Sequence, residues 1–71
     1  MRVVAVCPTE AGWEVRTDAI DNAQLFVTAM NAETAAHRLA RAIAHGGEDV
    51  SLQVHQRDGV LAQTRMVWAE D

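Results

Sequence analysis

The chain has a single cysteine, a single proline and no lysine among its 71 residues. With only Cys7 available, an internal disulfide is excluded, and a lone thiol fits a reducing cytoplasm. No Cys/His spacing resembles a structural zinc site, so we expect neither a metal nor a cofactor. A chain of this length buries only ~60% of the surface that it exposes when unfolded. Its stability must therefore come from a well-packed core or from association with another chain.

Long apolar runs and basic clusters are also missing from the sequence. No segment approaches the ~20 apolar residues that span a bilayer, and no basic stretch leads into an apolar run at the N-terminus. We therefore expect a cytoplasmic protein that makes no membrane contact. The formal net charge is −4, which argues against a general polyanion binder, because phosphate contacts need clustered Lys and Arg.

The hydrophobic pattern predicts a single α+β domain over residues 1–71. Five segments have the alternating or β-branched character of strands, namely residues 3–7, 13–17, 24–29, 50–55 and 60–68. Polar residues 18–23 predict a turn between the second and third of them. The expected order is β-β-β-α-β-β, giving an antiparallel-rich sheet with one helix packed on one face.

The helix is expected over residues 32–45. Asn31 is a suitable N-cap because its short side chain can accept a hydrogen bond from a free amide of the first turn. Gly46 and Gly47 end the helix. An apolar stripe with helical spacing is expected to face the sheet, and it consists of Ala35, Leu39, Ala42 and Ile43.

The last two strands are joined by an Asp-Gly turn, a typical hairpin signal. A two-residue loop would place Gln63 and Arg65 on the core face, where unpartnered polar groups are costly. We therefore predict a three-residue loop, residues 57–59, with Gly59 at positive φ and Val54 beside Ala62. In this register Trp68 continues the inward row, and Trp13 lies on the inward row of its own strand.

Several short motifs together resemble a known bacterial family. An apolar strand that ends at Pro8 precedes Gly12-Trp13-x-Val15, an Ala-rich helix follows, and Val54-His55-x-x-Asp58-Gly59 comes near the end. This pattern, over residues 3–64, resembles the family called domain of unknown function 2188. The resemblance implies a compact fold of one sheet and one helix. It implies no activity, and it brings no catalytic residues to this chain.

Few residues offer chemistry. His55 with Asp58 suggests acid–base work, but a base needs an orienting partner and a pocket, and this histidine is expected on an exposed strand face. His37 and His45 lie two helical turns apart, which is too far for two ligands of one metal without a third element. Cys7 has no neighbouring cation in sequence to activate it, so we interpret it as a packing residue. We therefore expect no catalytic residue.

The second face of the sheet is more informative. Val3, Ala5 and Cys7 alternate with an inward row, and Phe26 alternates with Leu25 and Val27. If the single helix covers only one face, Val3, Ala5, Cys7 and Phe26 form an exposed apolar patch, and such patches mark interfaces. A symmetric homodimer through this face or a strand edge is the expected way to bury it.

Three functions remain open. The first is a non-enzymatic binding or assembly module that acts as a homodimer, with a further protein partner unknown. The second is a nucleic-acid-binding module that uses Arg38, Arg41 and Arg57, although the acidic total makes nucleic acid an unfavoured partner. The third and least favoured is a small enzyme that uses His55.

Overall fold

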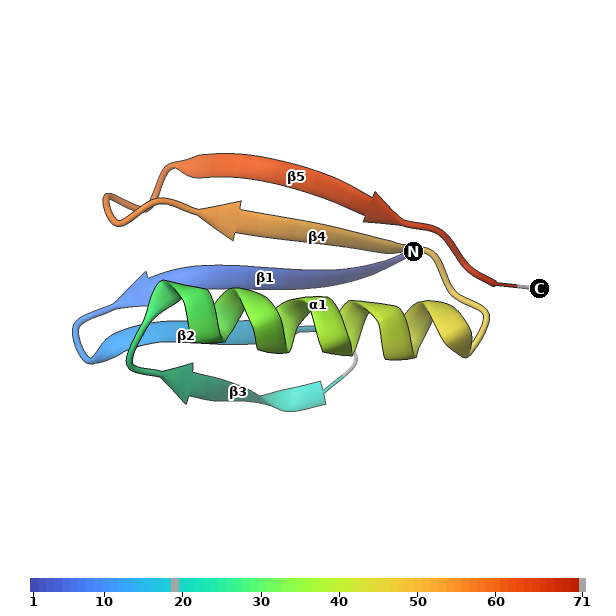
Figure 1. Ribbon diagram of the computed structural model, residues 1–71, viewed down its shortest axis with the longest axis horizontal. Coiled ribbons are helices and arrows are strands. Elements are labelled where there is room, and N and C mark those ends of the chain that lie inside the picture. Colours follow the sequence, from blue (N-terminus) through green and yellow to red (C-terminus); the bar gives the residue numbers. More distant parts are fainter. Residues whose placement is uncertain (19, 71) are drawn as a thin grey trace.

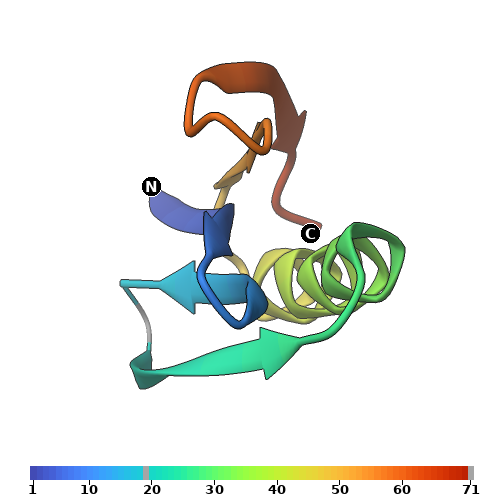
Figure 2. The same ribbon diagram turned by 90° about the vertical axis from the view of Figure 1, so that its left-hand side faces the viewer.

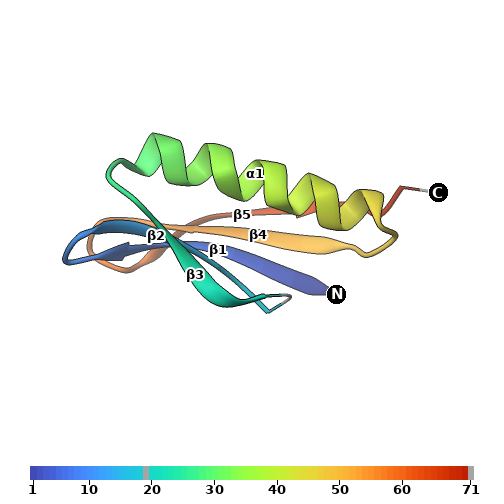
Figure 3. The same cartoon turned by 90° about the horizontal axis from the view of Figure 1, so that it is seen from below.

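The computed structural model describes residues 1–18 and 20–70. Five strands and one helix follow one another along the chain as β1 (Arg2–Thr9), β2 (Gly12–Thr17), β3 (Ile20–Phe26), α1 (Ala29–His45), β4 (Val50–His55) and β5 (Leu61–Val67) (Figure 1). The strands form one sheet in the order β3-β2-β1-β4-β5, and α1 lies across one of its faces (Figure 3). The α+β class and the β-β-β-α-β-β order are confirmed.

The sheet is mixed, whereas the sequence was expected to give an antiparallel-rich one. β1 pairs antiparallel with β2 but parallel with β4. The reason is the position of α1. This helix carries the chain back along the whole sheet after β3, so β4 starts at the same end as β3 and β1 and runs in their direction.

The helix begins three residues earlier than the sequence predicts. Thr28 is the N-cap, and its Oγ1 accepts a hydrogen bond from the amide of Asn31 at 3.2 Å. Asn31 thus belongs to the first turn and is not the cap. The C-terminal end at Gly46 is as predicted.

The buried face of α1 is a row of alanines at a spacing of four residues. This row consists of Ala32, Ala36, Ala40 and Ala44. Ala42, expected on the buried stripe, is exposed, while Leu39 and Ile43 pack at the side of the core. The methyl side chains let the helix backbone lie close to β1, β2 and β4. The predicted stripe was chosen to include the larger apolar residues, so it lies on a neighbouring face of the helix and not on the alanine row.

Under the helix lies a core of strand side chains. Its buried members from the sheet are Val4, Val6, Val15, Val50 and Leu52. Figure 2 looks along α1 and shows the sheet bending around it, with β3 and β5 as the two outer strands. The helix consequently covers the middle of the sheet more closely than its edges.

β3 differs from its predicted position. The segment 18–23 was expected to be a turn and 24–29 a strand, but β3 runs from Ile20 to Phe26; residue 19 of that turn lies outside the described residues. Polar residues in the segment hid the strand, although an outer strand tolerates them because one of its edges meets water.

The turn between β4 and β5 has the predicted form. The amide of Gly59 donates to the carbonyl of Gln56 at 2.8 Å, the amide of Gln56 donates to Val60 at 2.8 Å, and φ of Gly59 is +89°. Residues 57–59 therefore form the loop, with glycine in the left-handed position as expected.

The register beyond this turn was predicted wrongly. Val54 lies opposite Gln63, not Ala62, because the pairing shifts between Val54 and His55 and β5 contains one extra residue there, a β-bulge. Gln63 and Arg65 consequently lie on the side of the sheet that carries α1. Both remain exposed, since β5 lies beyond the cover of the helix, so the desolvation cost that argued against this register does not arise.

Trp68 is also wrongly predicted. It follows β5 and is 67% exposed, whereas Trp13 is half-buried against the core as expected. The register shift in β5 and its position at the sheet edge leave no inward row for Trp68 to continue.

Candidate functional site

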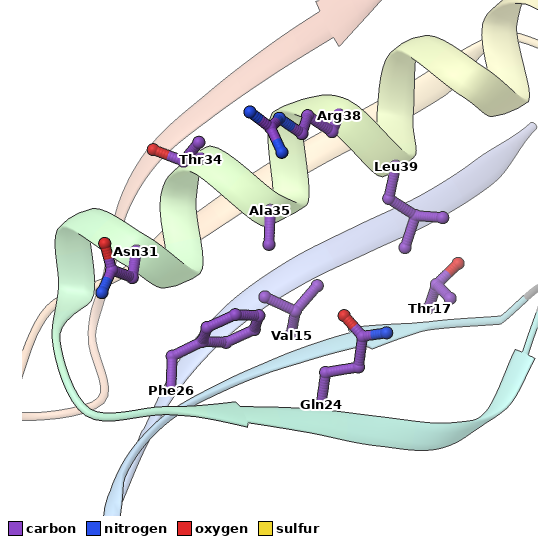
Figure 4. A pocket seen from close by; sticks show the side chains of 9 residues that line it. All are labelled: Val15, Thr17, Gln24, Phe26, Asn31, Thr34, Ala35, Arg38 and Leu39. Atoms are coloured by element: carbon purple, nitrogen blue, oxygen red, sulfur yellow. The ribbon is translucent and has the colours of Figure 1, made fainter.

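A groove lies between α1 and β3 (Figure 4). Its volume is about 780 Å³. The groove exists because the alanine row holds α1 over the middle of the sheet, while β3 continues outward beside it. It is open to solvent along the flank of the helix.

The groove has an apolar floor and a polar rim. Val15 and Phe26 rise from the strands toward α1, with Gln24 beside them (Figure 4). The helix contributes one flank, at the spacing i, i+3, i+4, i+7, i+8, that consists of Asn31, Thr34, Ala35, Arg38 and Leu39. Ala35 and Leu39 face Val15 and Phe26, so a ligand would contact hydrocarbon there. Thr17 and Gln24 add polar groups on the strand side, and Asn31, Thr34 and Arg38 add them along the helix.

Among the described residues that line the groove, Arg38 is the only one with a charged side chain. It is exposed, and its guanidinium takes part in no ion pair within residues 1–18 and 20–70. By contrast, Arg2 pairs with Glu48 at 2.9 Å and Arg16 with Glu14 at 3.7 Å. The groove therefore has one uncompensated positive charge.

Two large apolar side chains lie in water where β3 joins α1. Val27 is 85% exposed and Met30 is 75% exposed. They neighbour Phe26 and Asn31 in sequence, which line the same end of the groove. The apolar surface therefore extends beyond the groove at this end.

The other flank of α1 offers much less space. A hollow of about 20 Å³ lies between the helix and β5, lined by Glu33, His37, Leu52, Val54, Gln63 and Arg65. It holds at most about one water molecule. His45 lies elsewhere, with its Nδ1 2.7 Å from Glu70 Oε2. Among the described residues, no three His, Cys, Asp or Glu side chains gather as metal ligands.

The candidate catalytic residue His55 lies beside Cys7 on the opposite face of the sheet. Its Nδ1 is 3.6 Å from Cys7 Sγ and 3.1 Å from the carbonyl oxygen of Val6. A carbonyl oxygen only accepts, so Nδ1 must bear the hydrogen and cannot take the thiol proton. Asp58 does not orient His55, since its Oδ1 accepts from the amide of Val60 at 3.0 Å within the turn.

The thiol of Cys7 is not activated either. Partial burial raises its pKa above the ordinary value, and the charge of Glu14 raises it further, while Arg16 acts weakly in the other direction. A raised thiol pKa lowers the fraction of thiolate at neutral pH, and the thiolate is the nucleophile. Cys7 and His55 therefore form a packing contact, not a nucleophile and its base.

The predicted interface residues do not share one face. Val3, Ala5 and Cys7 lie on the face away from α1, as expected, and are half-buried. Phe26 lies opposite Trp13 and points toward α1, so its placement on the open face was wrong. The strand that carries it is shifted from its predicted position, and its neighbour Leu25, 64% exposed, lies on the open face instead.

The three arginines proposed for nucleic acid are not brought together. Arg38 and Arg41 are exposed on α1. Arg57 lies in the hairpin between β4 and β5, with its guanidinium 5.6 Å from the ring centroid of Trp13 and 3.4 Å from the carbonyl oxygen of Gly12. This contact holds Arg57 against the protein's own surface.

No protein-family model, curated protein or solved structure matches the chain. The helix of the described chain is neither long nor apolar enough to cross a membrane. Sequence reasoning missed the groove, although Asn31, Thr34 and Arg38 at i, i+3 and i+7 form a polar line beside the apolar Ala35 and Leu39. That line was a signal for an amphipathic flank next to a strand.

Proposed function

We propose that this chain is a non-enzymatic binding module whose ligand occupies the groove between α1 and β3. The observation that carries the proposal is the combination, in one preformed groove of about 780 Å³, of an apolar floor and a single unpaired cation. Binding sites are typically concave and mostly apolar, with a few polar groups that set orientation.

The lining favours binding over catalysis. Arg38 is the only ionisable side chain among the described lining residues, and a guanidinium stays protonated throughout the physiological pH range. It can hold an anion but cannot exchange a proton. The hydroxyl of Thr34 donates to the carbonyl of Met30 at 3.0 Å, and none of the described lining side chains is a base that would activate this hydroxyl as a nucleophile.

The proposal is tested by nuclear magnetic resonance with a library of small apolar carboxylates. We expect the amide signals of Val15, Gln24 and Leu39 to shift on binding. Ala35→Trp should abolish these shifts because the indole fills the groove. Ala42→Trp is the matched control, because Ala42 is exposed on the same helix and does not line the groove.

Two results would contradict the proposal. In the first, the fragments bind but shift only residues of the open face, such as Ala5 and Gln53. In the second, Ala35→Trp folds normally, as judged by circular dichroism, and binds the same fragments as the wild type.

A further inference from the structure

β3 lines one side of the groove, and its edge away from β2 has no partner strand in the described chain. This arrangement identifies a class of ligand. β3 is a terminal strand of the sheet, so within the described chain only β2 pairs with it. In an antiparallel pair, alternate backbone N–H and C=O groups point away from the partner strand. Residues 23–26 therefore present free backbone donors and acceptors at the side of the groove.

We propose that the groove binds an extended polypeptide segment of another protein, which adds to β3 as one more strand and places a carboxylate on Arg38. This inference rests on the proposed function and specifies its ligand. Addition of an extended peptide to a free sheet edge is a general mode of recognition, in which the backbone supplies affinity and pockets for alternate side chains supply selectivity.

The depth of the groove favours an apolar residue at alternate positions of the peptide. A strand added to β3 lies about 4.8 Å from it, and every second side chain points to the side of the sheet that carries α1. Those side chains would lie beside Phe26 and Gln24, on the side of β3 away from β2, and would reach over β3 toward the open side of the groove. The intervening side chains would point to the open face and meet water.

The charge of the groove favours a carboxylate in the ligand. Arg38 has no ion-pair partner in the described chain, and none of the described residues that line the groove is acidic. A guanidinium binds a carboxylate through two parallel hydrogen bonds. We assign this carboxylate to the C-terminus of the peptide.

The other edge of the sheet lacks these features. Both outer strands have a shifted register, β5 at His55 and β3 between the partners of Val15 and Thr17. β5 differs in having Arg65 on the side of α1, and the hollow beside it is only about 20 Å³. Bulges and inward-pointing charges are devices that protect an edge from pairing. Residues 23–26 of β3 contain no charged residue and no proline. This part of the β3 edge therefore lacks the inward-pointing charge that protects β5.

The test uses a pool of hexapeptides in which Thr alternates with Ala, Val, Leu, Ile or Phe, each made with a free C-terminal carboxylate and as the amide. We expect the acid forms to bind about tenfold more tightly than the amides, the effect of one exposed charge-assisted hydrogen bond. Arg38→Gln should abolish this preference. Arg41→Gln, which removes an exposed arginine outside the groove, should leave it unchanged.

Hydrogen exchange of backbone amides distinguishes the mode of binding. Bound peptide should slow the exchange of alternate amides in residues 23–26. Binding without this protection, or without the carboxylate preference, overturns the inference. Protection that grows with protein concentration in the absence of peptide would also overturn it, because a second copy would then occupy the edge.

The hexapeptides test the strand-addition inference, and the small carboxylates test the proposed function, so the two experiments can fail independently. If the small carboxylates shift the groove amides but no hexapeptide binds, the strand-addition inference is wrong and the groove remains a ligand site. If neither class of probe binds in the groove, both proposals are wrong.

Discussion

Cys7 Sγ lies 3.6 Å from His55 Nδ1, across the parallel pair of strands β1 and β4. The same nitrogen is 3.1 Å from the carbonyl oxygen of Val6, so its hydrogen points to that oxygen and the sulfur is at most a weak second acceptor. Two residues that often form a catalytic pair are thus adjacent here in an arrangement that cannot transfer the thiol proton.

Alkylation of Cys7 by iodoacetamide should be slow in the folded protein. Burial and Glu14 raise the thiol pKa, so the curve of rate against pH should lie at higher pH for the folded chain than for the chain in urea. Glu14→Gln should move the folded curve toward lower pH, because it removes a negative charge. Glu33→Gln, on the other face, is the control. Equal rates in buffer and in urea at pH 8 would contradict the expectation.

Alanine is required on the buried row of α1 because any larger side chain would push the helix from the sheet. Ala36→Leu should lower the free energy of unfolding by about 1–3 kcal/mol through overpacking. Ala42→Leu, the same change at an exposed site of the same helix, should alter it by less than about 0.5 kcal/mol. Urea unfolding measures both, and equal effects would show that α1 is not packed through this row.

Two glycines with positive φ should differ in their tolerance of a side chain. A Cβ at Gly59 would meet no atom within 4 Å, so Gly59→Ala should cost only the backbone strain, about 1–2 kcal/mol. A Cβ at Gly12 would overlap the carbonyl oxygen of Phe26. Gly12→Ala should therefore cost more than Gly59→Ala in urea unfolding, and the reverse order would contradict the close approach of β2 and β3 at the end of the groove.

The two tryptophans should differ in their access to solvent. Trp68→Phe leaves the half-buried Trp13 as the only emitter, and Trp13→Phe leaves the exposed Trp68. Acrylamide should quench the second variant more strongly and its emission should lie further to the red. Arg57→Ala should increase quenching of Trp13 and cost about 0.5–1 kcal/mol of stability, the value of an exposed cation–π contact. Equal quenching of the two variants would place Trp68 in the core after all.

The sequence predicts the helix and strands of this fold better than their register and their packing against one another. Strong alternation in residues 50–55 and the Gly46 stop are local signals, and both hold in the structure. The loop at Gly59 is also local, since one left-handed residue defines it. None of these required knowledge of what the helix covers.

The predictions of the β5 register and of the direction of Phe26 were wrong because both features depend on residues far apart in the sequence. The β-bulge in β5 is tolerated because α1 does not cover that edge, and no local pattern reports this. Phe26 faces α1 because β3 starts inside a polar segment that resembles a turn. The groove depends on both the alanine row and the outward position of β3, so it was not predicted from the sequence.

The expected homodimer stays a prediction, and the structure changes how it must be tested. Three of its four proposed contacts, Val3, Ala5 and Cys7, lie on the open face and are half-buried. Charged side chains border them, since Glu14 and Arg16 lie on the same face. The open face therefore offers a two-fold contact less apolar area than it would if Phe26 also lay on it.

Sedimentation at tens of micromolar protein should show a dimer for the wild type. Ala5→Arg should shift it to monomer, because the two-fold axis would bring like charges together and bury them without partners. Phe26→Glu should leave the dimer intact at equal folded fraction but should lower stability, since this side chain packs toward α1. A wild-type monomer would refute the dimer, and a monomer produced by Phe26→Glu but not by Ala5→Arg would place the contact on the groove side of the sheet.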